Sequence, residues 1–327
     1  MDIGTANSRV ATSAGIVFDE PTVVAIDTRS GEVVDVGEGA SDLVARTSRH
    51  IVAFRPLAQG ATIDFDVTAR LVSGLFDRAG VSALSRARVV MSVPSLATAI
   101  ERRALRQAAI QAGAREVSLL EAPLAAGIGL GLPVQEPVGS AVTVLGAGAS
   151  ESTVLSLGGI VTRSARRQGG SDVDAAIATR LRHRFGVVIA PTTAERLKVL
   201  LGSARGHASP QRERVMARTV EAGELVEVDV DAELVDEAVA DVVHAATAMV
   251  QEALAEAPPD LSQDVSARGM TLVGGHARLR DFAEVLARET GVDVRVAADP
   301  ELVIVRGLQM CLDEMSRLHA LFREADR

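Results

Sequence analysis

The chain has 327 residues, 47% of them hydrophobic, which predicts a globular protein with a sizeable interior divided into two domains. Its formal net charge of -9 argues against broad binding to nucleic acid, and no apolar run reaches the roughly 18 to 20 residues needed to span a bilayer. A single cysteine, Cys311, excludes a disulfide within the chain and favours a reducing cytoplasm as its setting.

The first half of the chain predicts alternating strands and helices. Val67, Leu71 and Leu75 recur at helical spacing, and Gly113 follows a segment of helical composition as a stop signal. Alternation of this kind favours an α/β architecture with helices packed on sheets. The expected strands lie around 9–18, 22–26, 33–37, 89–93, 116–120, 141–146 and 152–163, and the expected helices at 66–78, 98–112 and 123–131.

From Gly170 onward the pattern changes and indicates an inserted subdomain. A hairpin is expected across Ala222-Gly223, and a long helix from Ala232 to about Glu256 ends at Pro258-Pro259. The other expected elements are helices at 172–185, 192–201 and 278–289, a strand at 270–273, and a last helix from about Pro300 to the C-terminus.

Three loops rich in glycine and alanine lie far apart in the chain. They are Gly4-Thr5-Ala6-Asn7, Gly146-Ala147-Gly148 and Gly274-Gly275-His276-Ala277. Glycine allows the backbone to approach a phosphate closely, and the N–H groups of such a turn donate to phosphate oxygens. Each loop alone predicts only a tight turn, but the three together suggest a protein shaped to hold a nucleotide between two domains.

Several collinear segments resemble the MreB and MreB-like (Mbl) family of bacterial actin homologues over nearly the whole chain. They are Ile3–Asn7, Asp64–Thr68, Glu101–Ala104, Gln111–Ala114, Ser156–Val161 and Asp299-Pro300. The resemblance implies an α/β, actin-like two-domain ATPase fold, with duplicated ribonuclease-H-like domains around a nucleotide cleft. It implies domain I at 1–132 plus 306–327, with a small insert at about 20–80, and domain II at 133–305, with an insert at about 172–240.

The resemblance also assigns nucleotide contacts. Glu195 and Lys198 match the family's adenine and ribose contacts, and Lys198 is the only lysine in the chain. An exposed ion pair between these two side chains, on one helical face, is the alternative. His276 stands where the family has a third glycine; its side chain either takes up room beside the ligand or, the favoured interpretation, points to solvent. The expected nucleotide-binding residues are Gly4, Thr5, Ala6, Asn7, Gly146, Ala147, Gly148, Glu195, Lys198, Gly274, Gly275, His276 and Ala277.

The acids that hydrolysis requires are partly absent. Phosphoryl transfer to water needs charge neutralisation by Mg²⁺ and a group that positions the water. Asp2 matches the first acid that serves the metal in this family, whereas Val144 and Ala122 stand where the family has carboxylates. Loss of a water-positioning group typically costs about 10²- to 10⁴-fold in rate. We therefore expect binding of ATP, with Mg²⁺ held indirectly through Asp2, but little or no hydrolysis and no catalytic residue.

Three neighbouring acids leave alternatives open. Asp172 and Asp174 approach the phosphate side of the cleft through water or cap the helix that follows them. Glu121 points away from the cleft if its segment is extended, and partly replaces the missing carboxylate if it opens the following helix.

The leading hypothesis is a cytoskeletal filament subunit that organises cell-wall synthesis and cell shape, cytoplasmic and peripheral at the inner face of the cell membrane. The expected partners are other copies of the chain, other MreB homologues, the cell-wall synthesis machinery and the membrane surface. The candidate membrane contact is Gly80–Ser85, with Leu84 at its tip, multiplied by avidity in a filament. The alternatives are an adaptor that binds no nucleotide and joins a partner filament, and a kinase or chaperone-type ATPase of the same fold.

Overall fold

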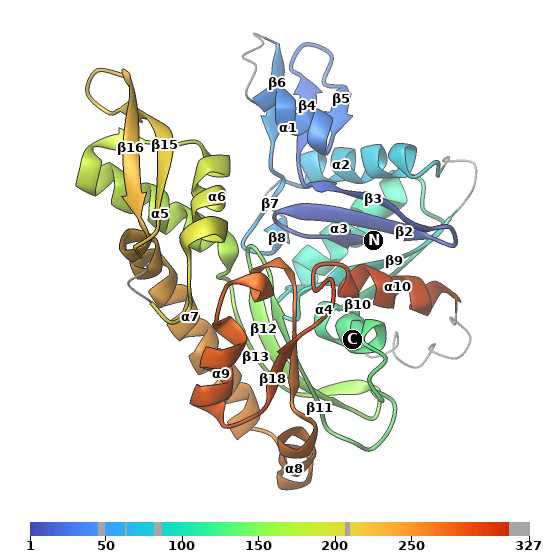
Figure 1. Ribbon diagram of the computed structural model, residues 1–327. Helices are drawn as coiled ribbons and strands as arrows, with labels where there is room; N and C mark the ends of the chain where they lie inside the picture. Colours follow the sequence, from blue (N-terminus) through green and yellow to red (C-terminus); the bar gives the residue numbers. More distant parts are fainter. Residues whose placement is uncertain (45–49, 63, 82–86, 207–209, 314–327) are drawn as a thin grey trace.

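The computed structural model describes residues 1–44, 50–62, 64–81, 87–206 and 210–313. Figure 1 shows two lobes that are separated at the top of the view and joined below. We call the part with β1 to β10 and α1 to α3 the N-terminal lobe, and the part with β11 to β18 and α5 to α9 the C-terminal lobe. Helices α4 (Ala122–Gly129) and α10 (Val303–Asp313) pack against each other beside the junction.

The N-terminal lobe is built on small sheets covered by helices. Leu71, Leu75 and Met91 are fully buried in its core, because the apolar face of α2 packs inward. Its elements are β1 (Asp2–Ile3), β2 (Asn7–Thr12), β3 (Gly15–Pro21), β4 (Val24–Asp27), β5 (Val33–Val36), α1 (Glu38–Val44), β6 (Ile51–Phe54), β7 (Leu57–Ala58), β8 (Ala61–Thr62), α2 (Phe65–Arg78), β9 (Arg88–Val93), α3 (Ala99–Gln111) and β10 (Glu116–Glu121). Strands β1, β2 and β3 form one antiparallel sheet, and β9 pairs in parallel with β10.

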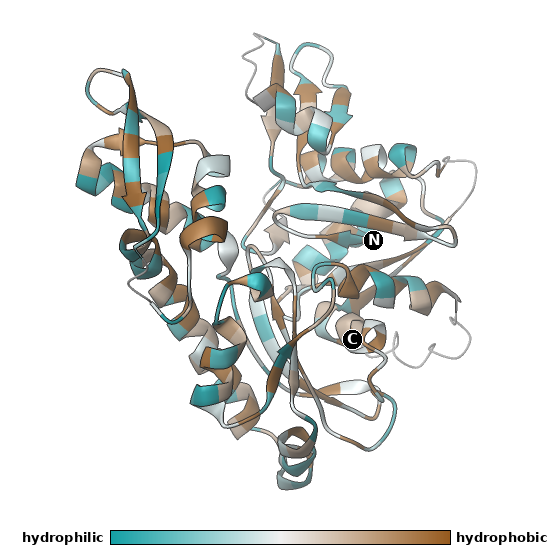
Figure 2. Ribbon diagram, in the orientation of Figure 1, coloured by the Kyte–Doolittle hydropathy of each residue, from teal (hydrophilic) through white to brown (hydrophobic). Residues whose placement is uncertain are grey.

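The C-terminal lobe is built on a five-stranded sheet in the order β13, β12, β11, β17, β18. Its strands are β11 (Ser140–Leu145), β12 (Ser150–Ser156), β13 (Gly159–Arg166), β17 (Met270–Val273) and β18 (Val294–Val296). The other elements are α5 (Gly170–Phe185), β14 (Val187–Val188), α6 (Pro191–Leu201), β15 (Arg212–Thr219), β16 (Leu225–Asp231), α7 (Ala232–Ala255), α8 (Pro259–Arg268), the short 3₁₀ helix η2 (Gly275–Arg278) and α9 (Phe282–Thr290). Helix α7 carries both hydrophobic and hydrophilic residues along its length (Figure 2). It packs on β12 and β13.

Several elements differ from the sequence-based expectations. The strand expected at 152–163 is two antiparallel strands, because Leu157 and Gly158 both adopt positive φ angles and reverse the chain. The helix expected from 278 begins at Phe282, after η2 and after Asp281 with a φ of 63°. The last helix begins at Val303, not at Pro300.

The helix α8 was not expected at all. Pro258-Pro259 does end α7, but Pro259 also opens the next helix, where the fixed φ of proline suits the first helical position. The same two prolines therefore end α7 and begin α8.

Candidate functional site

A cavity of about 380 Å³ lies between the lobes, and all three glycine loops line it. Glu195, Lys198, Asp2, Ala122 and Val144 line it as well. Ala277 is the exception among the expected residues: it is buried in the core beside the cavity. The cavity thus brings together residues from both ends and the middle of the chain. Its volume falls in the range of about 300 to 1,000 Å³ that small-molecule pockets occupy.

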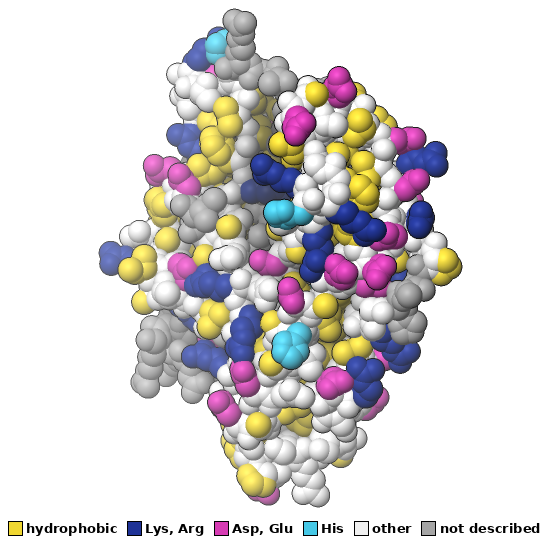
Figure 3. Space-filling view, turned by 90° about the vertical axis from the view of Figure 1, so that its left-hand side faces the viewer, with side chains coloured by type: hydrophobic (Ala, Val, Ile, Leu, Met, Phe, Trp, Pro, Cys, Tyr) yellow, Lys and Arg dark blue, Asp and Glu magenta, His cyan; other side chains and the backbone are white. Residues whose placement is uncertain are grey.

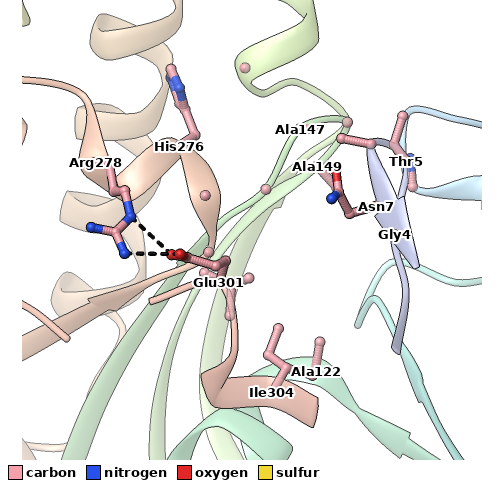
Figure 4. Close-up of a pocket in the computed structure, with 18 of the residues that line it drawn as sticks. Gly4, Thr5, Asn7, Ala122, Ala147, Ala149, His276, Arg278, Glu301 and Ile304 are labelled. Atoms are coloured by element: carbon pink, nitrogen blue, oxygen red, sulfur yellow. Dashed lines mark hydrogen bonds and ion pairs between the residues drawn. The ribbon is translucent and has the colours of Figure 1, made fainter. Parts of the chain in front are cut away.

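Two of the loops have matching geometry. The Gly4 N–H donates to the Asn7 carbonyl at 3.0 Å, and the Gly146 N–H donates to the Ala149 carbonyl at 3.0 Å. A Cβ atom at Gly146 would lie 2.7 Å from that same Ala149 oxygen, so the turn requires glycine there. Figure 4 shows the two turns close together on one side of the cavity, opposite His276 and Arg278. Backbone N–H groups in turns of this kind are suited to phosphate oxygens.

The two turns are also linked by a third segment. The Thr5 hydroxyl accepts a hydrogen bond from the Gly60 N–H at 3.0 Å, in the β7–β8 turn. A Cβ atom at Gly60 would meet that of Ala149 at 3.0 Å, and one at Gly148 would collide with the Thr5 side chain. The backbones approach so closely here that only glycine fits.

The third loop forms the other end of the cavity. Gly274 has a φ of 89°, and a Cβ atom there would collide with the Leu145 carbonyl. Gly275, by contrast, faces open space, with no atom within 4 Å of the position that its Cβ would take. The backbone of Gly275 is therefore free to lie against a ligand.

His276 is buried, so the expectation that it points to solvent is wrong. Its side chain is 6% exposed and lies edge-on against Phe282, with ring centroids 5.7 Å apart. Burial, with a smaller contribution from the positive charge of Lys198, lowers the pKa of His276 to about 3. Figure 4 shows the imidazole rising from η2, away from Arg278 and Glu301. The ring is therefore a neutral part of the cavity wall.

Lys198 binds Asp174 and not Glu195, which was its partner in the ion-pair alternative. Its ammonium donates to the Gly170 carbonyl at 3.1 Å and to the Asp174 carboxylate at 2.9 Å. Burial raises the pKa of Asp174, while Lys198 opposes that rise. Asp172 caps α5 by accepting from the Gly169 N–H at 2.8 Å, which confirms the capping alternative for this residue. The sole lysine is thereby held at the cavity wall in one orientation.

The end of the cavity that was expected to hold phosphate is partly apolar. Ala122, Val144 and Ile304 line it, and Figure 4 shows Ala122 and Ile304 side by side on its floor. Glu121 is the N-cap residue of α4, but its carboxylate is held by Arg102 at 2.8 Å. Because it is so held and does not line the cavity, Glu121 does not replace the missing carboxylate.

The donor set for a metal is small. The carboxylate of Asp2 lines the cavity and accepts a hydrogen bond from the Ser92 hydroxyl at 2.5 Å. Among the described residues, no group of three or more His, Cys, Asp or Glu could hold a metal ion. Mg²⁺ that is carried by nucleotide phosphates needs only one or two carboxylates. Asp2 fits that indirect role, but one carboxylate is too few for a metal site made of protein ligands alone.

Glu151 also lines the cavity, although no sequence motif indicated it. It lies on β12, with its Cα opposite that of Val144, and is 4% exposed. Its carboxyl accepts hydrogen bonds from the Ser95 N–H at 2.9 Å and from the Ser95 hydroxyl. Burial raises the pKa of Glu151 to about 7. The pairing register of β11 and β12 places Glu151 beside Val144, and no short sequence pattern gives that register.

An ion pair that no sequence motif indicated lies at the end of the cavity formed by the third loop. The Arg278 guanidinium binds the Glu301 carboxylate with two bonds, of 3.0 and 2.9 Å, drawn as dashed lines in Figure 4. This two-bond geometry fixes the edge of the cavity below His276.

Solved structures share this arrangement over almost the whole chain. MreB5 of Spiroplasma citri bound to AMPPNP superimposes with a TM-score of 0.88 at 25% identity, covering 98% of this chain and 96% of that one. The MamK double helical filament superimposes with a TM-score of 0.80 at 19% identity, covering 96% and 97%. The fold and the cavity thus define an actin-like protein, and the expected actin-like two-domain α/β fold is confirmed.

The sequence comparisons specify the family. The model of the family described as MreB/Mbl protein matches residues 1–320. The cell shape-determining protein MreB of Escherichia coli (strain K12) is 39% identical over 333 residues, covering 99% of this chain and 96% of that protein. The chain belongs to the MreB/Mbl family, as its motifs predicted.

Proposed function

We propose that this protein is a filament subunit that organises cell shape and cell-wall synthesis, binding ATP in the cavity and hydrolysing it poorly. One observation carries the proposal: three glycine loops converge on one cavity, whose phosphate end presents Ala122 and Val144 instead of carboxylates. The relation to a protein named for determining cell shape supports the cellular role.

The nucleotide would lie with its phosphates against the two adjacent turns at Gly4 and Gly146. Its nucleoside would lie against Gly275 and α6, where Glu195 and the positioned Lys198 line the cavity. The solved MreB5 structures with ADP and AMPPNP support this use of the cleft. The two lobes would correspond to domain I, at 1–132 plus 306–327, and domain II, at 133–305.

Hydrolysis would be weak or absent, so that the protein is at most a very weak ATPase. Mg²⁺ bound to the phosphates would neutralise their charge, and Asp2 would hold it through water. Methyl and isopropyl groups at Ala122 and Val144 neither orient a water nor accept its proton. A loss of about 10²- to 10⁴-fold in rate follows from the missing water-positioning group.

Self-assembly is the expected mode of action, and the filament formed by the structural neighbour MamK supports it. Within the described ranges, no helix combines the length and apolar character that crossing a membrane requires. Most of the candidate membrane loop, including Leu84, lies outside the described residues. Figure 3 shows acidic and basic side chains interspersed on one face, which supports the absence of a nucleic-acid partner.

The test combines assembly and turnover in one sample. Purified protein is incubated with Mg²⁺ and either ATP or AMPPNP, then examined by electron microscopy while phosphate release is measured beside E. coli MreB. We expect filaments with both nucleotides and phosphate release at least tenfold slower than that of E. coli MreB. Turnover as fast as that of the relative would contradict the proposal. Assembly only after addition of a second family member, without nucleotide, would favour the adaptor alternative.

A further inference from the structure

Side chains from the C-terminal lobe hold one short segment of the N-terminal lobe. This segment, residues 94–98, joins β9 to α3, and we call it the β9–α3 loop. Glu151 accepts from the N–H and the hydroxyl of Ser95, while Arg163 donates to the Ser95 carbonyl at 3.5 Å. Arg167 donates to the Leu96 carbonyl at 3.4 Å. Ser95 is thus bonded through its backbone N–H, backbone carbonyl and side chain to the opposite lobe.

The loop is connected directly to the phosphate end of the cavity. It follows β9, in which Ser92 donates to Asp2. Pro94 and Glu151 both line the cavity, one from each lobe. Movement of the loop away from β12 would therefore widen the cavity at this end.

The charged groups around Glu151 do not offset the effect of burial on its pKa. Glu121, at the end of β10, raises the pKa of Glu151, and Arg163, on β13, lowers it. Arg102, on α3, and Arg163 both bind the Glu121 carboxylate, at 2.8 and 3.5 Å. The two Ser95 hydrogen bonds also lower the pKa, but loss of solvation outweighs them.

We propose that Glu151 and Ser95 form a proton-controlled latch between the lobes: neutral Glu151 keeps the β9–α3 loop against the five-stranded sheet, and ionised Glu151 releases it. Release widens the cavity and speeds exchange of its ligand. The Arg167–Glu101 ion pair, at 3.0 Å, remains as a second attachment of α3 when the latch opens.

The direction of the pH effect follows from linkage. When the latch is closed, the Glu151 carboxyl is buried and its pKa is about 7, compared with an ordinary value of 4.5. Opening exposes it to water, which returns the pKa toward 4.5, so opening releases a proton and rising pH favours it. With these two values, the open fraction grows by about 30-fold between pH 5.5 and 8.5, and most of that growth occurs below pH 7.

Amide hydrogen exchange at Ser95 tests the latch in protein without nucleotide. After correction for the intrinsic exchange rate, we expect its protection factor to fall by about 30-fold from pH 5.5 to 8.5. Glu151→Gln keeps a neutral side chain of the same shape, so protection should stay high at both pH values. Glu224→Gln, an exposed glutamate beside the β15–β16 turn, is the control and should behave as the unsubstituted protein does.

Two results would overturn the latch. One is pH-independent protection of Ser95 in the unsubstituted protein; the other is an unchanged pH dependence in Glu151→Gln. Ser95→Ala provides a second variant, because it removes one hydrogen bond and leaves the acid. Its loop should be less protected at every pH while the pH dependence remains.

The effect on ligand exchange rests on the proposed function, and a separate experiment tests it. Dissociation of a fluorescent ATP analogue should accelerate between pH 5.5 and 8.5 in the unsubstituted protein and stay slow in Glu151→Gln. Nucleotide that binds but dissociates at the same rate from both proteins at pH 8.5 would refute the link between latch and cavity. Absence of any nucleotide binding would refute the proposed function, and hydrogen exchange at Ser95 would then decide on the latch alone.

Discussion

Replacement of His276 by phenylalanine tests whether the imidazole is buried in its neutral form. The aromatic contact with Phe282 is kept, while the titratable group is removed. Because the pKa of His276 is about 3 in the folded protein and 6.5 in the unfolded chain, the unfolded chain binds the proton more tightly between these values. Stability from this group is thus present above pH 6.5 and lost as the pH falls toward 3.

The magnitude follows from the two pKa values. At pH 4.5, two units below the unfolded value, protonation favours the unfolded chain by about 100-fold, or about 3 kcal/mol. Urea unfolding followed by circular dichroism at pH 7.5 and 4.5 measures this change. The stability of His276→Phe relative to the unsubstituted protein should rise by about 3 kcal/mol between these pH values.

The difference between the two proteins isolates His276. Glu151 makes the stability of the folded protein change with pH in the opposite direction. Its raised pKa gives stability that is present below pH 4.5 and lost as the pH rises through about 7. Because both proteins contain Glu151, its contribution does not affect the difference between them. His244→Phe, at an exposed histidine on α7, is the matched control and should show no such change. Parallel stability curves for His276→Phe and the unsubstituted protein would refute the burial argument.

Two further substitutions test the two ends of the cavity. Ala122→Glu restores a carboxylate at the first turn of α4, where the helix dipole favours it. The substitution should raise the rate of phosphate release from bound ATP by at least about tenfold in a single-turnover assay. An unchanged rate would show that the missing carboxylate is not what limits hydrolysis. Lys198→Ala removes the positioned ammonium and should weaken ATP binding by about tenfold in a fluorescence titration, whereas Arg196→Ala, on the same helix and paired with Glu213, should not. Equal affinities in the two variants would exclude Lys198 as a ligand contact.

Much of the fold could be predicted because local patterns determine it. The apolar face of α2 and the glycine stop after α3 are visible within a few residues of sequence. Elements were missed where one residue has two roles, as Pro259 does in ending one helix and starting another. They were also missed where a two-residue turn with positive φ angles reverses the chain, as Leu157 and Gly158 do.

In the candidate site, too, locally determined features were predicted and contacts between distant residues were not. The glycine turns were predicted because close backbone approach restricts the residue type locally. The partners of Glu151 and Lys198 were not, because Ser95 lies 56 positions from Glu151 and Asp174 lies 24 from Lys198. Such contacts depend on how the lobes and helices pack, which no short pattern encodes. The burial of His276 likewise depends on Phe282, in a different helix.

The most direct test of the central claim is ATP binding by the unsubstituted protein and by Gly275→Val, with Mg²⁺ present. The valine side chain would project into open space, so it should fill the nucleoside end of the cavity without disturbing the ligand-free fold. We predict saturable binding that Gly275→Val weakens by at least about tenfold, with unchanged thermal stability of the ligand-free protein. Absence of binding to the unsubstituted protein, or equal affinity in both, would contradict the assignment of this cavity as the nucleotide site.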